Sequence, residues 1–373
     1  MRVLIISLNT YSSPYNDGKL KHLGPRLEGL VVVAGNATTL WGEENCARSG
    51  SGYEVVVLPL RFARSVATAR LIGLDELADS VRPTVIHVEA EPWQEIAAQS
   101  VRIARRLKVP IGVHFAENGP RLGSTGGAIR KARGSWVLKH CDFAVGWSTA
   151  STRIAECLAP GIRTETFPAT GISTTASGRF TEQWFGAESE HLPKLVFVGR
   201  FAREKGIQDF LEICDELACR LPIRAALAGG EDAYEIVHRW VAERPWALLH
   251  GVLPREKVSS LFMAADVLVC PSRTTRSVKE QFGKAAIEAM AVGTPVFAYD
   301  CGALSEVIAT GGVVVPEGEQ GELVDELQEY FAASANHRDG LAQEARRRAM
   351  QFADEVLAER LIKLWSTCGE PCP

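Results

Sequence analysis

Signals of several protein classes are missing from this sequence. No apolar run reaches the ~18 residues that a membrane-spanning helix needs. Met1 leads almost directly into an apolar stretch, so we expect no signal peptide. The chain also carries no long internal repeat, low-complexity tract or coiled-coil pattern. These absences favour a globular protein of the cytoplasm.

Common nucleotide and metal motifs are missing as well. There is no Gly-x4-Gly-Lys-Ser/Thr, and no Gly-x-Gly-x-x-Gly follows the first apolar stretch, which argues against kinase-type ATPases and dinucleotide oxidoreductases. The nine cysteines form no Cys-x2-Cys pair, so we expect reduced thiols and no zinc site. No Asp-x-Asp occurs anywhere. The sequence therefore predicts no metal ion and no cofactor.

The composition fits a soluble chain with two cores. It has 373 residues, of which 46% are hydrophobic and 23% are charged, whereas single domains commonly run to ~100–200 residues. The formal net charge is −4 and the isoelectric point is about 6.1. This acidic balance argues against a general nucleic-acid binder.

Apolar stretches with strand composition alternate with helical stretches along the chain. The expected strands of the first half are 3–6, 30–33, 55–58, 84–88 and 164–167. Those of the second half are 195–198, 224–228, 247–250, 267–270, 296–299 and 313–315. The alternation predicts an α/β protein with doubly wound sheets. We expect one domain over 1–180 and a second over 192–350, joined by a polar linker.

Two glutamates eight positions apart lie in the most informative stretch, residues 271–295. Glu280 stands before Phe282 and Gly283, where an Ala-rich run predicts the start of a tightly packed helix, and Glu288 lies inside that helix. Because the stretch follows an expected strand, the helix would begin at the carboxyl edge of a sheet. Anions and nucleotides bind at such places, since free N–H groups and the positive end of the helix dipole point outward. The two carboxylates are spaced to hold two separate sets of hydroxyls.

A second stretch, residues 195–206, ends an expected strand in Gly199 and Arg200 and continues to Lys205. Negative charge grows on a leaving diphosphate as the bond to its sugar breaks, and fixed cations then stabilise the transition state more than the ground state. Arg200 can bond two phosphate oxygens at once, and Lys205 can supply a point charge. Together the two stretches predict a site for a sugar attached to a diphosphate.

Both stretches resemble a known family. Glu-x7-Glu followed by Ala-Met-Ala-x-Gly-Thr-Pro-Val, and a strand ending in Gly-Arg with a following Lys-Gly, resemble the signatures of the retaining glycosyltransferases of group 1, also called family 4. The resemblance is strong over 195–315 and looser over 1–120. It implies the GT-B fold, in which two Rossmann-like doubly wound domains face a cleft. It also implies that Glu280 contacts the donor sugar and that Glu288 holds the ribose, while backbone amides after the first glutamate contact the diphosphate.

The resemblance places further residues near the donor. A glycine in the first loop of many relatives lies near the donor phosphate, which points to Gly18, and backbone groups that contact the base fall at Gly251. Ser272 leads into the loop before Glu280. The expected donor-binding set is Glu288, Phe282, Gly283, Gly199, Gly251, Ser272 and Gly18. Backbone contacts to the base leave UDP and GDP unresolved.

Polar residues at the ends of two first-half strands are expected on the acceptor side. Glu89 and Glu91 lie in a segment that resembles the Asp-x-Val-His-x-Glu-x-Glu-Pro of one family branch, although Glu91 as a cap of the next helix is the alternative. Glu117 and Asn118 follow the next strand, and we expect Glu117 among the catalytic residues. We expect His114 inside that strand. Which of His114 and Glu117 lies beside the reacting sugar stays open.

Basic residues without an acidic one run from Arg121 to Lys139. Arg121 itself is expected on the acceptor side. The segment 121–139 is suited to a phosphate-bearing acceptor or to peripheral contact with an anionic membrane, and a plain solvated helix face is the alternative.

The chain is expected to be helical from Glu322 to its end, with Gly340 as the clearest break. An apolar stripe recurs there at helical spacing: Phe352, Val356, Leu357, Leu361 and Trp365. We expect a helix over 352–368 to pack back on the first domain. A core stripe of the second domain is the alternative.

The sequence therefore predicts a metal-independent hexosyltransferase-type enzyme. It would move a sugar from a UDP- or GDP-sugar to a hydroxyl or amine of a small-molecule, glycan or lipid-linked acceptor, with retention of configuration as the family implies. A sugar-nucleotide epimerase, a phosphorylase and a catalytically silent sugar-nucleotide-binding subunit are the alternatives. An epimerase needs no acceptor and a phosphorylase needs orthophosphate, so activity assays separate them.

Overall fold

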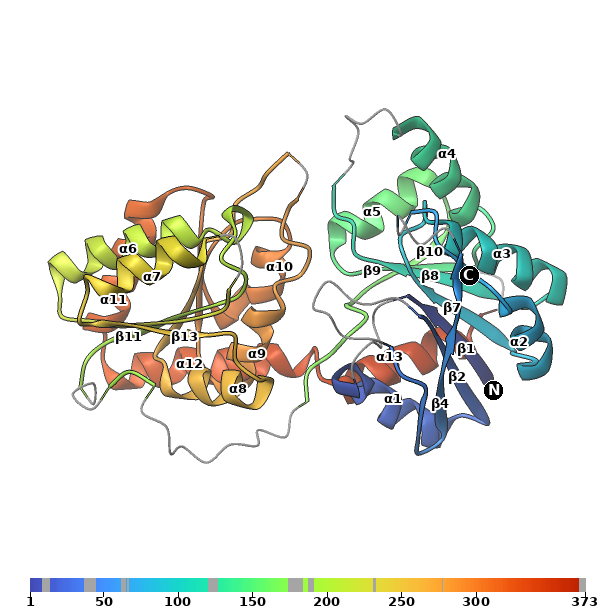
Figure 1. Cartoon of the computed structure of the whole chain (residues 1–373), viewed down its shortest axis with the longest axis horizontal. Helices are drawn as coiled ribbons and strands as arrows, with labels where there is room; N and C mark the ends of the chain where they lie inside the picture. Colours follow the sequence, from blue (N-terminus) through green and yellow to red (C-terminus); the bar gives the residue numbers. More distant parts are fainter. Residues whose placement is uncertain are drawn as a thin grey trace. The chain divides into compact units, whose positions relative to one another are not determined.

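The computed structural model divides the chain into two compact units (Figure 1). The first comprises Met1–Ser173 together with Phe352–Pro373, and the second comprises Thr174–Gln351. The structure describes the residues 1–8, 14–36, 45–61, 65, 67–119, 127–173, 184–186, 191–230, 233–276 and 278–368. Acceptor binding by 1–180 and donor binding by 192–350 stay predictions.

Within the described residues, the first unit has an eight-stranded sheet in the order β10-β9-β8-β7-β1-β2-β4-β3. The strands are β1 (Arg2–Ser7), β2 (Gly29–Gly35), β3 (Arg48–Gly50), β4 (Tyr53–Leu58), β7 (Val85–Glu89), β8 (Ile111–Phe115), β9 (Phe143–Gly146) and β10 (Arg163–Thr166). All pairings are parallel except that between β3 and β4. A separate antiparallel pair is formed by β5 (Leu60–Arg61) and β6 (Arg70–Leu71).

The central strand of this sheet is buried on both faces. In β1, Val3 and Ile5 belong to one hydrophobic core, while Leu4 and Ile6 belong to another. A parallel strand covered by helices on both sides needs such an apolar run without polar alternation. This is why its sequence reads as one continuous stretch of aliphatic residues.

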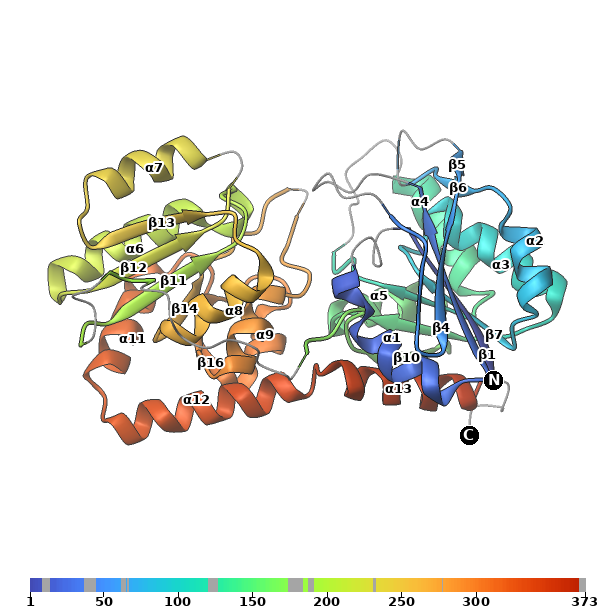
Figure 2. The same ribbon diagram turned by 60° about the horizontal axis from the view of Figure 1, so that its bottom comes forward.

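Helices cover both faces of the first sheet. They are α1 (Gly18–Leu23), α2 (Leu74–Val81), α3 (Glu95–Leu107), α4 (Gly127–Leu138), α5 (Thr149–Leu158) and α13 (Asp354–Ser366), with 3-10 turns η1 (Pro14–Asp17) and η2 (Gly24–Arg26). Side chains of α1 and α13 share one core, and those of α2 and α3 share the other. Both views show α1 and α13 side by side (Figures 1 and 2).

The last helix completes the core of the first unit. Leu357, Leu361, Leu364 and Trp365 of α13 are at most 2% exposed. They pack in one cluster with residues of α1 and of strand β1. The first unit is therefore made of two chain segments that are distant in the sequence.

Within its described residues, the second unit has a six-stranded parallel sheet in the order β13-β12-β11-β14-β15-β16. The strands are β11 (Lys194–Val198), β12 (Arg224–Ala228), β13 (Ala247–Gly251), β14 (Val267–Cys270), β15 (Val296–Tyr299) and β16 (Gly312–Val315). The helices are α6 (Ile207–Arg220), α7 (Tyr234–Ala242), α8 (Arg255–Ala264), α9 (Lys284–Val292), α10 (Leu304–Ile308), α11 (Gln320–Ala332) and α12 (Ala335–Met350), with 3-10 turns η3 (Arg203–Lys205) and η4 (Ala309–Gly311). Side chains of α6, α7 and α11 pack on one face of this sheet.

The structure confirms the predicted α/β class with two Rossmann-like parallel sheets. The expected strands 224–228, 267–270 and 296–299 coincide with β12, β14 and β15. The expected break at Gly340 is wrong, because that residue lies inside α12. The breaks lie instead between α11 and α12, where Ala333 is extended, and between α12 and α13, where Ala353 is extended.

No helix in the described parts of the chain combines the length and the apolar character that crossing a membrane requires.

Candidate active site

The predicted donor residues of the second unit gather at one edge of its sheet. Strands β11 and β14 are neighbours and run parallel, so the loops that follow them leave the sheet side by side. Gly199 and Arg200 follow β11, and Ser272 follows β14. The carboxyl edge of a parallel sheet is where ligands bind in such folds.

A close backbone approach locks these two loops together. Gly206, which precedes α6, has a φ of +69°, and a Cβ built on it would lie 1.7 Å from the carbonyl oxygen of Pro271. Only glycine combines that backbone conformation with that approach. The approach holds η3, and with it Lys205, beside the loop that follows β14.

An ion pair joins the two predicted catalytic stretches. Lys205 Nζ lies 2.6 Å from Glu280 Oε2, and the two side chains are 31% and 12% exposed. Ser272 Oγ donates a hydrogen bond of 3.3 Å to the same carboxylate oxygen. The structure thus brings together three residues that are up to 75 positions apart in the sequence. A cation and a carboxylate that remain partly exposed are accessible to a ligand.

Arg200 has a partner that the sequence analysis did not foresee. Its Nη2 lies 2.5 Å from Glu204 Oε1. Burial opposes ionisation of Glu204, but hydrogen bonds from the backbone and from Arg200 outweigh it and lower the pKa of this carboxyl. The i,i+4 rule gave no signal for this pair, because it applies within helices and Arg200 lies in the loop before η3. A phosphate at this position has to share or replace Glu204 as the partner of Arg200.

The helix start at α9 has the predicted form. Gly283 is its N-cap residue with a φ of +83°, and Phe282 before it is buried. Glu288 lies within α9, 3.6 Å from Arg255, with its side chain 19% exposed. Burial raises the pKa of the Glu288 carboxyl, although Lys284 and Arg255 oppose this. Donors such as sugar hydroxyls would favour its ionised form by adding hydrogen bonds.

The remaining donor-side predictions fall in separate places. Gly251 is the last residue of β13, which pairs with β12 in parallel. The loop that follows Gly251 therefore leaves the sheet at its carboxyl edge, like the loops after β11 and β14. Gly18 lies in the first unit, where a Cβ on it would collide with the carboxylate of Asp354. In this structure Gly18 packs closely against Asp354 at the start of α13, and its role near the donor phosphate stays a prediction.

A cysteine nucleophile does not fit this site. Cys270 ends β14 near Glu280, and burial raises the pKa of its thiol to about 12. The thiolate is the nucleophilic form, and it is scarce near neutral pH at such a pKa.

The acceptor-side glutamates of the first unit have different surroundings. Glu89 ends β7 and pairs with Lys19 of α1 at 2.5 Å, with both side chains at most 2% exposed. Glu91 accepts hydrogen bonds from the backbone N–H groups of Ala116 and Glu117, at 3.2 and 3.3 Å. Glu91 therefore ties the loop after β7 to the loop after β8.

Glu117 and His114 face different parts of the first unit. Glu117 lies after β8 and borders a cavity between α4 and α5. His114 lies within β8, as predicted, and its ring contacts the rings of His87 and Phe167. Asn118 is half-buried beside Glu117. Arg121 falls outside the described residues.

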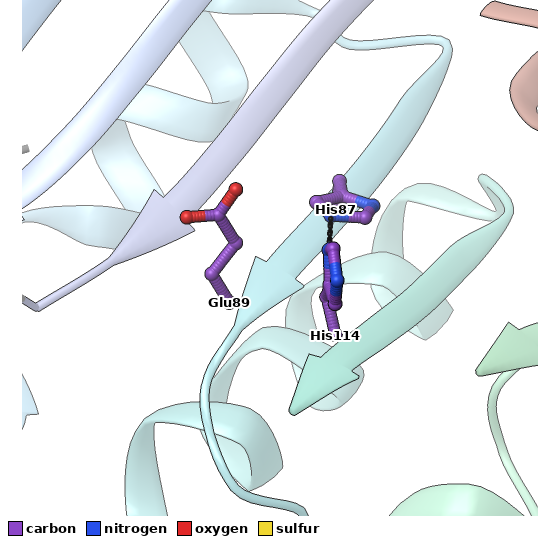
Figure 3. A group of neighbouring side chains, drawn as sticks. All are labelled: His87, Glu89 and His114. Atoms are coloured by element: carbon purple, nitrogen blue, oxygen red, sulfur yellow. Dashed lines mark hydrogen bonds between the residues drawn. The ribbon is translucent and has the colours of Figure 1, made fainter. Parts of the chain in front are cut away.

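His87, Glu89 and His114 lie close enough together to suggest a metal centre (Figure 3). Hydrogen bonds, however, use all four ring nitrogens. Trp365 Nε1 donates to His87 Nδ1 at 3.3 Å, the rings are joined by a 3.3 Å bond from His87 Nε2 to His114 Nδ1, and His114 Nε2 bonds the carbonyl oxygen of Phe167 at 2.8 Å. Burial lowers the pKa of both histidines well below 6.5. The cluster fits a neutral hydrogen-bonded chain and not a metal site.

Two helix-covered, mainly parallel sheets, one in each unit, are the architecture of the GT-B fold. Solved structures agree over the full chain. HepE from Anabaena, in complex with UDP, is similar with a TM-score of 0.73 at 15% identity, covering 98% of this chain and 100% of HepE. A glycosyltransferase from Rickettsia africae gives a TM-score of 0.75 at 13% identity, covering 100% of this chain and 99% of its own. At such identities the likeness establishes the fold.

The family follows from the second unit. Residues 179–348 match the family model described as "Glycosyl transferases group 1". The match covers the unit that holds both signature stretches, and it confirms their resemblance to that family. The match leaves the first unit to be interpreted from its own residues.

Curated relatives agree with this family. A glycogen synthase of Mycobacterium tuberculosis is 28% identical over 248 residues, covering 62% of this chain and 56% of the relative. A D-inositol 3-phosphate glycosyltransferase of Corynebacterium urealyticum is 30% identical over 245 residues, covering 60% of this chain and 53% of the relative. The chain spans about half the length of these relatives.

Proposed function

We propose that this chain is a hexosyltransferase-type glycosyltransferase. It transfers a sugar from a nucleoside diphosphate sugar to a hydroxyl or amine acceptor, with retention of configuration. The observation that carries the proposal is the Lys205–Glu280 ion pair before the start of α9, with Arg200 in the loop after β11. Both lie in the unit that matches the group 1 glycosyl transferases. UDP is the favoured leaving group, since a structural neighbour was solved with UDP-glucose.

The proposed chemistry uses the two cations on the leaving diphosphate. Lys205 pairs with Glu280 and Arg200 pairs with Glu204. A diphosphate carries more charge than either carboxylate, so it competes for both cations, and its charge grows further as the sugar bond breaks. Glu280, released from Lys205, becomes an acceptor for sugar hydroxyls.

The other predicted residues take supporting roles in this proposal. Glu288 accepts hydrogen bonds from the ribose, and the N–H groups that follow Gly283 meet a phosphate at the start of α9. Gly199, Gly251, Phe282 and Ser272 shape the donor site. Glu117 and Asn118 are assigned to the acceptor side. A location in the cytoplasm belongs to the same proposal.

A thermal-shift panel tests the donor site. We expect UDP, GDP and their sugars to raise the melting temperature, because a ligand that binds only the folded state stabilises it by RT ln(1 + [L]/Kd). NAD should give no shift. Arg200→Ala should abolish most of the shift, whereas the exposed neighbour Arg203 provides the matched control, and Arg203→Ala should leave the shift unchanged.

Product analysis then separates the reaction classes. Transfer that depends on an added acceptor supports the proposal. Conversion of the donor sugar without an acceptor would indicate an epimerase, and dependence on orthophosphate would indicate a phosphorylase. Donor binding without any turnover would indicate a silent binding subunit. An Arg200→Ala protein that binds nucleotides like the wild type would remove Arg200 from the site.

A further inference from the structure

A cavity of about 330 Å³ lies in the first unit between α4 and α5, beyond the residues used above for donor binding. The two helices are neighbours in Figure 1 and contact each other directly. Ser135 Oγ of α4 donates a 2.9 Å hydrogen bond to the carbonyl oxygen of Leu158, the last residue of α5. The helices are thus tied together at one end of the cavity. Its volume is at the lower end of the range typical of small-ligand sites.

The wall of the cavity includes three apolar side chains. Trp93 comes from the segment before α3, and Ile154 and Leu158 come from one face of α5. Gly134 of α4 is buried beside Leu158 and Trp93, so this part of the wall is closely packed. An apolar group that entered the cavity would lose contact with water, and burial of such surface is favourable by about 25 cal/mol per Å².

Three cationic side chains border the same cavity: Arg130 and Lys131 of α4, and Arg153 of α5. Within the described part of the chain, no carboxylate forms a salt bridge with any of these three. Arg133 on the same helix differs, because it lies 3.8 Å from Glu95 and bonds the carbonyl oxygen of Trp93. Among the described residues that line the cavity, the carboxylate is that of Glu117, which is 8% exposed. The positive charge of the border therefore exceeds the negative charge.

We propose that this cavity binds an amphipathic anion, a molecule with one apolar chain or ring and one phosphate group. The apolar part lies against Trp93, Ile154 and Leu158, and the phosphate meets Arg130, Lys131 and Arg153. Charge complementarity selects the anion, and the concave apolar wall selects a single inserted group over a flat surface. The inference deepens the proposed function, because Glu117 of the acceptor side borders the cavity. Binding of a probe is measured without turnover, so its failure and the failure of the transfer reaction can be told apart.

Cys157 provides a direct readout, because it is exposed and lines the cavity. Its alkylation by N-ethylmaleimide is followed at peptide level in the full chain, with exposed Cys219 of the second unit as the internal control. Monomeric decyl phosphate, below its micelle concentration, is the probe. At about four times Kd it leaves roughly one fifth of the sites empty, so labelling of Cys157 should slow about fivefold. Labelling of Cys219 should not change.

Matched variants test each part of the cavity, each compared with its own rate without probe. Arg153→Gln should abolish most of the protection, whereas Arg105→Gln, the same change on exposed α3 surface, should keep it. Ile154→Trp fills the cavity and should abolish protection, whereas Ile72→Trp at a residue that is 51% exposed should not. Protection that survives both Arg153→Gln and Ile154→Trp would overturn the proposal.

Other probes in the same labelling assay decide between classes of ligand. Inorganic phosphate alone and decanol alone should protect weakly, because each lacks half of the proposed contacts. Equal protection by either one would replace the proposal with a simple anion site or an apolar pocket. Protection by phosphatidylglycerol vesicles but not by monomeric decyl phosphate would identify a membrane-facing surface instead. Equal slowing at Cys157 and Cys219, or none at either, would also overturn it.

Discussion

Two ion pairs in this protein differ in how far their side chains are buried. Lys19 and Glu89 are both at most 2% exposed, so water and ligands have no access to the pair. Lys205 and Glu280 are 31% and 12% exposed, and a ligand can take the place of one partner. The first pair therefore serves the fold, and the second suits a binding site.

Glu89→Gln tests this division at a residue for which the sequence suggested an acceptor role. Removing one partner of a buried ion pair leaves the other charge uncompensated, so we expect a loss of about 3–5 kcal/mol in the free energy of unfolding. Urea denaturation measures it. Glu165→Gln is the control, because its pair with Arg360 is more than one third exposed on both sides and should contribute little. Unchanged stability of Glu89→Gln with lost activity would instead favour an acceptor role.

The buried histidines predict a pH dependence of stability. Burial lowers the pKa of His87 and His114 well below 6.5, so below about pH 6.5 the unfolded chain binds protons that the folded chain does not. The free energy of unfolding should therefore fall as the pH falls, by up to ~1.4 kcal/mol per pH unit for each histidine.

Urea titrations between pH 7.5 and 5.5 measure this slope. His114→Gln should remove about half of the histidine contribution, as one of two such groups is lost. The exposed His337 is the control, and His337→Gln should leave the slope as it is in the wild type. Equal slopes in all three proteins would mean that the buried pair does not titrate on unfolding.

Two glycines in or next to helices differ in how much space a side chain would have. Gly340 lies on the exposed side of α12, and a Cβ built there meets nothing within 4 Å. Gly206 before α6 has a positive φ and an almost direct approach to the carbonyl of Pro271. The sequence alone does not distinguish the two glycines, although one has free space around it and the other is tightly packed.

Alanine at these two positions should change stability in opposite directions. Gly340→Ala should raise the free energy of unfolding by about 0.5–1 kcal/mol, because alanine favours the helix interior. Gly206→Ala should lower it by more than ~1–2 kcal/mol, because the left-handed backbone and the approaching carbonyl both disfavour a Cβ. Thermal and urea denaturation check both. A stabilised Gly206→Ala protein would show that the two loops can separate without cost.

The whole molecule is organised so that its last helix belongs to the first unit. Chain segments Met1–Ser173 and Phe352–Pro373 together form that unit, and the second unit is inserted between them in the sequence. The core side chains Leu357, Leu361, Leu364 and Trp365 each contribute about 1.5–3 kcal/mol by burial, or roughly 6–12 kcal/mol together. This is comparable to the whole stability of a typical domain, about 5–15 kcal/mol.

A chain ending at Gln351 should therefore lose the first unit selectively. Limited proteolysis along a urea series, read by mass spectrometry, should show cleavage within 1–173 at low urea while the core of the second unit stays protected. A chain ending at Cys368 keeps α13 and should behave like the full chain. Resistance of both units in the shorter chain would show that the first unit folds without α13.

The sequence by itself determined the α/β class, most strand positions and the placement of Glu280 before a helix start. Apolar strands such as 267–270 and the turn around Gly283 are local signals, which act over a few residues. Charged pairs were decided only by the tertiary structure. Lys205 meets Glu280 across 75 positions, and Lys19 meets Glu89 across 70, because neighbouring parallel strands and packed helices bring distant segments together. Partner choice and burial, which separate a binding residue from a structural one, arise only when the chain is folded.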